Sequence, residues 1–183
     1  DSLGFKETIT KLYPHKENSI KQVPLAGKNV FILGAGGVSS SIIFALYKSG
    51  AKIILSNRTK NKAEELKKLF PKLEILDWGE KPLNCNIVIN TTSVGLIKDE
   101  EIKIDFSDYN ESPHKDVLFY DLIYNPKETR FLKSARLRGN KTMNGQMMFL
   151  NQAKYAFNLW TNIIPKIDDE VVKILNKWLK LEF

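Results

Sequence analysis

Short apolar runs alternate with longer amphipathic stretches along this chain. Residues 28–33, K-N-V-F-I-L, form an apolar run that ends in glycines, which is typical of a buried parallel strand. Residues 38–49 then place apolar side chains at helical spacing and stop at Gly50. The same patterns predict strands at 52–56, 73–76, 86–90, 117–121 and 141–143, helices at 60–70, 129–138, 145–160 and 168–181, and a loop at 97–115. This alternation indicates βαβ units, and right-handed crossovers then give a doubly wound α/β fold with a parallel sheet and helices on both faces.

The composition is that of an ordinary globular chain, with 43% hydrophobic and 27% charged residues among 183. This length can bury a core of its own, and about one domain is expected. No apolar run approaches the roughly 18 residues of a membrane helix, and no signal peptide opens the chain, so we expect no membrane partner. The single cysteine, Cys85, cannot form an internal disulfide and fits a reducing compartment. We therefore expect the protein in the cytoplasm.

The formal net charge of +7 raises the question of a nucleic-acid partner. The lysines are scattered along the whole chain, without a basic block that is interleaved with aromatic residues. We therefore expect a basic surface that attracts small anions, and no nucleic-acid partner. The two histidines, His15 and His114, have no partner at the spacing of metal ligands, so no metal site is predicted.

A glycine-rich turn, G-A-G-G-V-S at residues 34–39, follows the first strand and opens the first amphipathic helix. Gly34 would allow the tight turn, and Gly36 would let the backbone approach a pyrophosphate. The amides at the start of the helix would bind the phosphates. A glycine-rich turn alone is a weak signal, but between a strand and a helix it predicts a Rossmann-like dinucleotide site. The candidate contacts in this turn are Gly34, Ala35, Gly36, Gly37 and Val38.

The end of the second strand indicates which dinucleotide is bound. NAD enzymes place a carboxylate there for the ribose 2′-hydroxyl, but this strand ends in S-N-R-T without an acid. Arg58 offers a planar pair of donors for a 2′-phosphate, and Lys62 adds a second positive charge one helical turn later. We therefore predict NADP as the cofactor, with Asn57 and Thr59 as further contacts.

Two polar turns follow later strands, at the edge of the sheet where ligands bind in open α/β folds. The first is N-T-T-S-V-G at residues 90–95, and its candidate cofactor contacts are Thr91, Thr92 and Ser93. The second is D-L-I-Y-N-P at residues 121–126. Taken alone, each of them is simply a polar turn.

Six motifs in the same order make this chain resemble the shikimate dehydrogenase family. The family pattern has an N-T-D-x-x-G-F hinge, G-A-G-G-A-[SA], N-R-T, N-[AT]-[TS]-x-x-G, D-x-x-Y-x-P-x-x-T and N-G-x-x-M-x-x-x-Q-[AG]. This chain has D-S-L-G-F at residues 1–5, the turns described above, D-L-I-Y-N-P-K-E-T at 121–129, and Asn144-Gly145 with Met148, Gln152 and Ala153. The resemblance covers essentially the whole chain.

The resemblance implies an enzyme that interconverts 3-dehydroshikimate and shikimate with NADP in aromatic amino-acid synthesis. Asp1 matches a hinge aspartate that acts at the reacting hydroxyl together with a lysine, and Tyr124 and Gln152 match residues that contact the substrate. Leu122 and Gly145 fall where the family's backbone approaches the nicotinamide. The family's catalytic lysine and its serine-containing substrate motif have no counterpart here. We therefore expect this chain to bind NADP but to turn over shikimate poorly.

The resemblance also divides the chain into three parts. Residues 1–15 would be a hinge helix from a truncated N-terminal substrate domain, 16–143 the NADP-binding domain, and 144–183 helices that return toward the missing domain. Apolar surface near Phe157, Trp160 and Trp178 should then be exposed, or covered by another copy in a homodimer. A quinate or aminoshikimate dehydrogenase of the same fold stays open as an alternative, as does a non-catalytic nucleotide-binding module.

Overall fold

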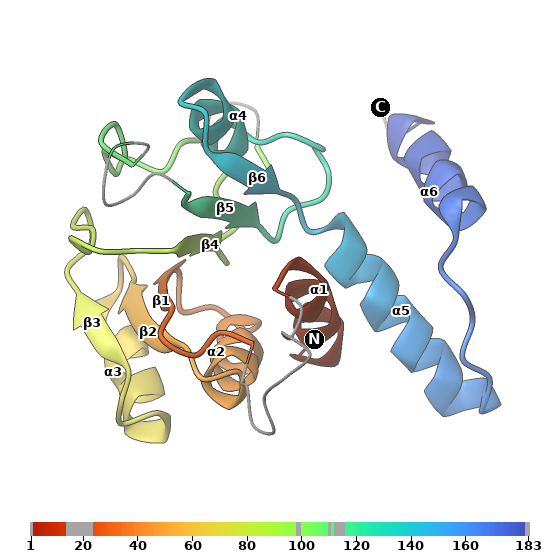
Figure 1. Cartoon of the computed structure of the whole chain (residues 1–183), viewed down its shortest axis with the longest axis horizontal. Helices are drawn as coiled ribbons and strands as arrows, with labels where there is room; N and C mark the ends of the chain where they lie inside the picture. The colour runs from red at the N-terminus through yellow and green to blue at the C-terminus, as the bar shows by residue number, and fades with distance from the viewer. Residues whose placement is uncertain (1, 14–23, 98–99, 110, 112–115, 182–183) are drawn as a thin grey trace.

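A six-stranded, wholly parallel sheet organises the chain in this computed structural model (Figure 1). The structure describes residues 2–13, 24–97, 100–109, 111 and 116–181. The strands are β1 (Asn29–Leu33), β2 (Lys52–Ser56), β3 (Glu74–Leu76), β4 (Ile87–Asn90), β5 (Leu118–Asp121) and β6 (Lys141–Met143). Their order, β3-β2-β1-β4-β5-β6, reverses direction between β1 and β4. This reversal is the switch point at which open α/β sheets bind ligands. The predicted doubly wound fold is confirmed.

Six helices form within the described residues, close to the predicted ranges. They are α1 (Ser2–Leu12), α2 (Ser39–Lys48), α3 (Lys60–Leu69), α4 (Arg130–Leu137), α5 (Gln146–Thr161) and α6 (Asp169–Leu181). Along β1, Val30 and Ile32 point into the core beneath α1 and α2, while Phe31 and Leu33 point to the opposite face. Because both faces of the sheet are covered, the central strands are apolar along their length, and their polar residues stand at the ends, at Asn29, Asn90 and Asp121.

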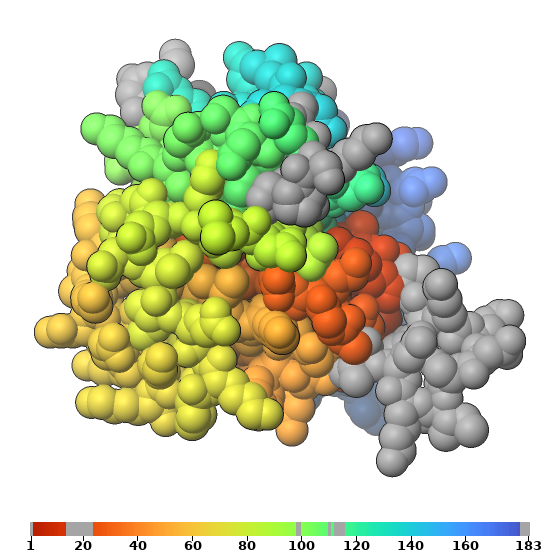
Figure 2. Space-filling model, turned by 60° about the vertical axis from the view of Figure 1, so that its left-hand side comes forward, coloured from red at the N-terminus to blue at the C-terminus, as the bar shows by residue number. Residues whose placement is uncertain are grey.

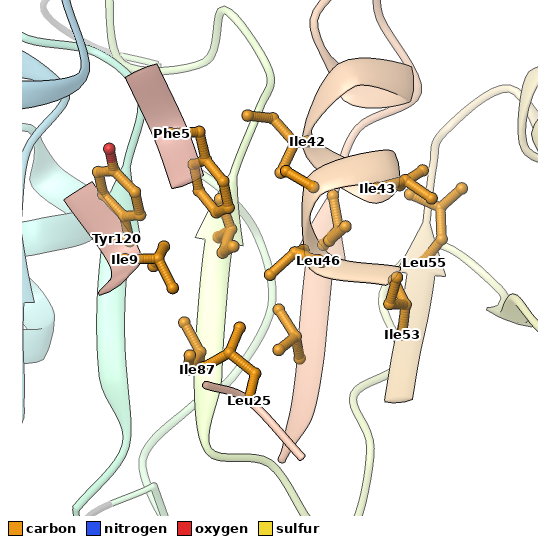
Figure 3. Close-up of a cluster of buried hydrophobic side chains, with 14 of the residues drawn as sticks. Phe5, Ile9, Leu25, Ile42, Ile43, Leu46, Ile53, Leu55, Ile87 and Tyr120 are labelled. Carbon is orange, nitrogen blue, oxygen red and sulfur yellow. The ribbon is translucent and has the colours of Figure 1, made fainter. Parts of the chain in front are cut away.

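Helices α1 and α2 cover one face of the sheet. Figure 3 shows Phe5 and Ile9 of α1 beside Tyr120 of β5, and Leu46 of α2 nearer β1 and β2. The rings of Phe5 and Tyr120 are stacked with their centroids 5.7 Å apart. On its other side α1 packs against α5, where the Nζ atom of Lys154 donates to Glu7 at 2.8 Å. Helix α1 is therefore held by both the sheet and α5.

The opposite face is covered by α4 and by an irregular segment before β5. In the described part of 97–115 no helix or strand forms, as predicted. The segment is nevertheless packed into the core through Ile102, Ile104, Phe106 and Tyr109, all of which are buried. Figure 2 shows this green segment lying against the yellow-green residues that follow β3, where the Tyr109 hydroxyl donates to the carbonyl of Pro82. The segment takes the place that a helix would occupy in a regular βαβ crossover.

Candidate functional site

The glycine turn after β1 lies at the carboxyl edge of the sheet, against the turn after β4. Gly34 has φ +107°, and a Cβ atom there would lie 2.7 Å from Cγ2 of Thr92 and 2.9 Å from Oγ1 of Thr91. Only glycine combines this conformation with so close an approach. The Thr91 hydroxyl lies 2.9 Å from the carbonyl oxygen of Leu33 and 2.9 Å from the hydroxyl of Ser39. The glycine turn and the N-T-T-S-V-G turn at residues 90–95 therefore meet at the edge of the sheet where ligands bind in such folds.

The S-N-R-T turn at the end of β2 joins the same edge through Asn57. The backbone amide of Ala35 donates to Oδ1 of Asn57 at 3.0 Å, and Nδ2 of Asn57 donates to the carbonyl of Thr59 at 2.7 Å. The side chain of Asn57 therefore ties the glycine turn to the end of β2. This contact was not part of the sequence prediction, which treated Asn57 only as a cofactor contact.

The backbone in front of the glycine turn is open to a ligand. A Cβ atom added at Gly36 or Gly37 would have no neighbour within 4 Å, and both residues are exposed. Helix α2 begins two residues later, with no side chain capping its start and no acidic residue in its first turn. Uncapped amides at a helix N-terminus attract anions, so this turn can hold phosphate groups.

A cavity of about 420 Å³ extends from the glycine turn to the end of β2, and we name it the first cavity. Ten of the predicted cofactor residues line it: Gly34, Ala35, Gly36, Asn57, Arg58, Thr59, Lys62, Thr91, Thr92 and Ser93. Trp78, Val94 and Glu100 line it as well and were not predicted. Trp78 lies two residues after the end of β3, at the carboxyl edge of the sheet. This position in the sequence could have indicated that it contacts a ligand.

Two positive charges face the first cavity without a carboxylate partner. Arg58 and Lys62 are exposed and form no ion pair with another described residue, whereas the nearby Lys60 is paired with Asp77 at 2.7 Å. An unpaired guanidinium beside an ammonium is suited to bind a phosphate monoester. The geometry thus provides an anion site at the end of β2.

A second cavity, of about 550 Å³, continues from Thr91 and Thr92, which line both cavities. Its wall contains Val38, Leu122 and Tyr124 of the predicted set, and the ring of Tyr124 stacks on Phe149 at 4.6 Å between centroids. The sequence analysis missed the apolar residues that α5 and α6 add, namely Phe149, Leu175, Trp178 and Leu179. This second cavity is therefore largely apolar, with a tyrosine at its wall.

Gly145 supports the second cavity from behind without lining it. A Cβ atom at Gly145 would lie 1.9 Å from the carbonyl oxygen of Leu122, and the Gly145 amide donates to the carbonyl of Ile123 at 3.1 Å. Gly37 also lines neither cavity. Gln152 faces α1, with its Cγ atom 2.9 Å from the place of a Cβ at Gly4, and does not join Tyr124 in the second cavity. Asp1 lies outside the described residues.

A buried carboxyl group holds the turns after β4 and β5. Asp121 is fully buried, and its two oxygens accept hydrogen bonds from Nδ2 of Asn90 at 3.0 Å, the amide of Ile123 at 3.1 Å and the hydroxyl of Thr129 at 2.6 Å. Removal from water raises the pKa of Asp121 to about 6, and the three hydrogen bonds only partly oppose this rise. The resemblance had assigned no role to Asp121 or Thr129.

These features define the class of protein. A parallel sheet in this strand order, with a glycine turn at the switch point and two connected cavities beside it, is a Rossmann-type α/β domain. Residues 17–129 match the shikimate / quinate 5-dehydrogenase family, and the chain belongs to this family.

Individual relatives agree with this assignment. The chain is 47% identical over 177 residues to the shikimate dehydrogenase (NADP(+)) of Pelagibacter ubique. The matched region covers 96% of this chain and 62% of that protein. The crystal structure of the Aquifex aeolicus shikimate dehydrogenase superposes with a TM-score of 0.76 at 36% identity, over 90% of this chain and 56% of that one. The crystal structure of the 5-ketofructose reductase of a Gluconobacter strain superposes with a TM-score of 0.71 at 29% identity, over 90% of this chain and 59% of that one. The chain thus spans about three fifths of the length of the relatives that it matches.

Two further observations concern the described residues alone. None of their helices is long and apolar enough to span a membrane. No group of three or more His, Cys, Asp or Glu side chains comes together there in a way that could hold a metal ion.

Proposed function

We propose that this chain is the NADP-binding part of a dehydrogenase that interconverts 3-dehydroshikimate and shikimate. One observation carries the proposal: Arg58 and Lys62, which form no ion pair within the described part of the chain, line the first cavity at the strand end where NAD-binding domains place an acid. Membership of the shikimate / quinate 5-dehydrogenase family supports the reaction. The relative from Pelagibacter ubique carries the name shikimate dehydrogenase (NADP(+)).

The two cavities match the two halves of a dinucleotide. In this proposal the 2′-phosphate and adenosine lie in the first cavity beside Arg58, and the pyrophosphate lies over Gly36 and the start of α2. The nicotinamide then lies in the second cavity beside Leu122. When bound, NADPH would supply the hydride for carbonyl reduction. Apolar walls from α5 and α6 would keep water away from that position.

The substrate contacts remain proposals of the same kind. Tyr124 is well placed because its ring is at the wall of the second cavity, next to the proposed nicotinamide position. For Gln152 and Asp1 the proposal rests on the motif resemblance alone. The structural likeness to a 5-ketofructose reductase favours one alternative, a dehydrogenase of the same fold that acts on another polyol or ketone, such as quinate.

Cofactor choice tests the proposal. Calorimetric titration of the chain should show NADP+ binding at least about tenfold more tightly than NAD+, which corresponds to ~1.4 kcal/mol. Arg58→Ala should remove most of this preference. Lys60→Ala is the matched control, because Lys60 is a neighbouring cation that is paired with Asp77 and does not line the first cavity. Equal affinities for the two cofactors, or an unchanged preference in Arg58→Ala, would contradict NADP as the cofactor.

The C-terminal helices present an apolar surface that the proposal assigns to a substrate-binding domain. Trp160 is 82% exposed and Trp178 67%, as predicted, and Leu159, Ile163 and Ile164 are exposed near Trp160. Exposed apolar side chains that gather around the end of α5 are typical of an interaction site, and the relatives are longer than this chain. Sedimentation of the chain alone tests the assignment: a monomer agrees with it, and a stable homodimer would show that a second copy covers the surface instead.

A further inference from the structure

Three segments of the site meet at the buried carboxylate of Asp121. It stands at the end of β5, and it receives one hydrogen bond from each of three places: the end of β4, the turn after β5 and the start of α4. The donors are Asn90, the amide of Ile123 and Thr129. No basic side chain contributes to these contacts. A carboxylate with three donors and no countercharge acts as a hub for hydrogen bonds.

The hub controls the turn after β4 through Asn90. While Nδ2 of Asn90 donates to Asp121, Oδ1 of Asn90 accepts from the amide of Thr92 at 3.0 Å and from its hydroxyl at 2.6 Å. Nδ2 of Asn90 also donates to the carbonyl of Val94 at 3.2 Å, within the same turn. Asp121 is thus the acceptor outside the turn that fixes the orientation of Asn90, and through it the position of Thr92. Thr92 lines both cavities.

The hub controls the turn after β5 through its bond to the amide of Ile123. Leu122 lies between Asp121 and Ile123 and lines the second cavity. Gly145 holds the Leu122 carbonyl from the other side, at a distance that leaves no room for a Cβ atom. The backbone of Leu122 is therefore fixed between a carboxylate contact and a glycine.

Thr129 completes the arrangement and links it to α4. Its hydroxyl donates to Asp121 at 2.6 Å and accepts from the amide of Leu132 as the cap of α4. Its Cγ2 atom lies against Gly95, at the end of the turn after β4. A single buried threonine thus touches both the carboxylate and the turn that the carboxylate positions.

We propose that Asp121, Asn90 and Thr129 form a positioning unit that shapes the second cavity for the nicotinamide half of NADP, without touching the cofactor. The unit acts through Thr92 and Leu122. Leu122 lines only the second cavity, whereas the adenosine half depends mainly on Arg58 and the glycine turn, so the unit acts chiefly on the nicotinamide half. The inference rests on the proposed function.

A ligand that lacks the nicotinamide separates the two halves of the site. The variant Thr129→Val keeps the shape of the side chain and removes the hydroxyl that donates to Asp121. Calorimetry with NADP+ and with adenosine 2′,5′-bisphosphate should show about tenfold weaker binding of NADP+ and less than about twofold change for the bisphosphate. Retained bisphosphate binding also shows that the variant is folded. The fluorescence of bound NADPH, which reports on the nicotinamide surroundings, should fall toward that of the free cofactor.

Two further variants sharpen the comparison. Thr129→Ser restores the hydroxyl and should restore NADP+ affinity to within about threefold of the original chain. Thr8→Val is the matched control, because Thr8 is also a buried threonine with a hydrogen-bonded hydroxyl, but it lies on α1 against Asn151. It should leave both affinities unchanged. If Thr129→Val does not fold, Asp121→Asn, which keeps the volume of the side chain, answers the same question.

The outcomes are distinct. Equal losses for the two ligands, no loss for either, or failure of Thr129→Ser to restore binding would overturn the positioning role. An unaltered chain that binds neither NADP+ nor the bisphosphate would instead overturn the proposed function on which the role depends.

Discussion

The buried carboxyl of Asp121 makes the stability of this fold depend on pH in an unusual direction. Its pKa is raised from 3.8 to about 6 in the folded protein because the side chain is fully buried. Between pH 3.8 and about 6, the folded state therefore keeps a proton on Asp121 that the unfolded state has released. The stabilising contribution is complete below pH 3.8 and is lost as the pH rises through about 6.

The size of this effect follows from the shift. Each pKa unit corresponds to about 1.4 kcal/mol, so a change from 3.8 to about 6 amounts to ~3 kcal/mol of unfolding free energy. Urea unfolding at several pH values from about 2.5 to about 8, for the original chain and for Asp121→Asn, isolates this group because the range begins below the unfolded pKa of 3.8. The free energy of the original chain minus that of the variant should fall by ~3 kcal/mol across this range.

A second carboxylate provides a control of opposite sign. The backbone amide of Ser107, followed by its side chain, lowers the pKa of the exposed Asp105. The difference between the original chain and Asp105→Asn should therefore rise with pH, as the unfolded carboxyl ionises after the folded one. If the difference for Asp121→Asn were constant with pH, or rose as it should for Asp105→Asn, the reasoning about burial of Asp121 would be refuted.

Two further substitutions test the packing around the site. Phe106→Ala should lower the free energy of unfolding by about 3–5 kcal/mol in urea titrations, because its ring is buried against Phe119 and Phe131. The control Leu83→Ala, at a position that is 93% exposed, should change this free energy by less than about 0.5 kcal/mol. Gly145→Ala should lower the midpoint of thermal unfolding, because its Cβ would lie 1.9 Å from the Leu122 carbonyl, and Gly37→Ala, with no neighbour within 4 Å, should not. An unchanged midpoint in Gly145→Ala would show that the backbone of Leu122 is not held in place.

The irregular segment before β5 shows where sequence patterns stop being informative. Ile102, Ile104 and Phe106 follow each other at every second position, and Tyr109 comes three residues later. This spacing belongs to neither a helix nor a sustained strand, so a loop was the correct prediction for its backbone. Its burial depends on the uncovered face of β4 and β5, which only the assembled sheet defines. The apolar wall of the second cavity was missed for the same reason. Val38 and Trp178 are far apart in the sequence, and only the folded chain brings them to the same cavity.

The parts of the site that could be predicted are those carried by local turns. A glycine turn between a strand and a helix, and an arginine without an acid at the next strand end, depend on a few adjacent residues, and both were found at the carboxyl edge. The turns after later strands were also expected at the carboxyl edge, because parallel strands end on the same side of a sheet, and Asn57 and Thr91 do lie against the glycine turn.

Each polar turn of this site combines a residue that holds the turn with a neighbour that faces a cavity. Asp121 holds its own turn while Leu122 faces the second cavity, and Asn90 holds the turn after β4 while Thr92 faces both cavities. The pairing follows from the geometry of a sheet edge, where a side chain at the strand end is enclosed by neighbouring turns and the next residue emerges from the sheet. Motif resemblance cannot separate the two kinds of residue, because both recur in the same pattern. Asn90 and Asp121 line neither cavity, so loss of cofactor binding after their substitution is no evidence that these side chains touch the cofactor.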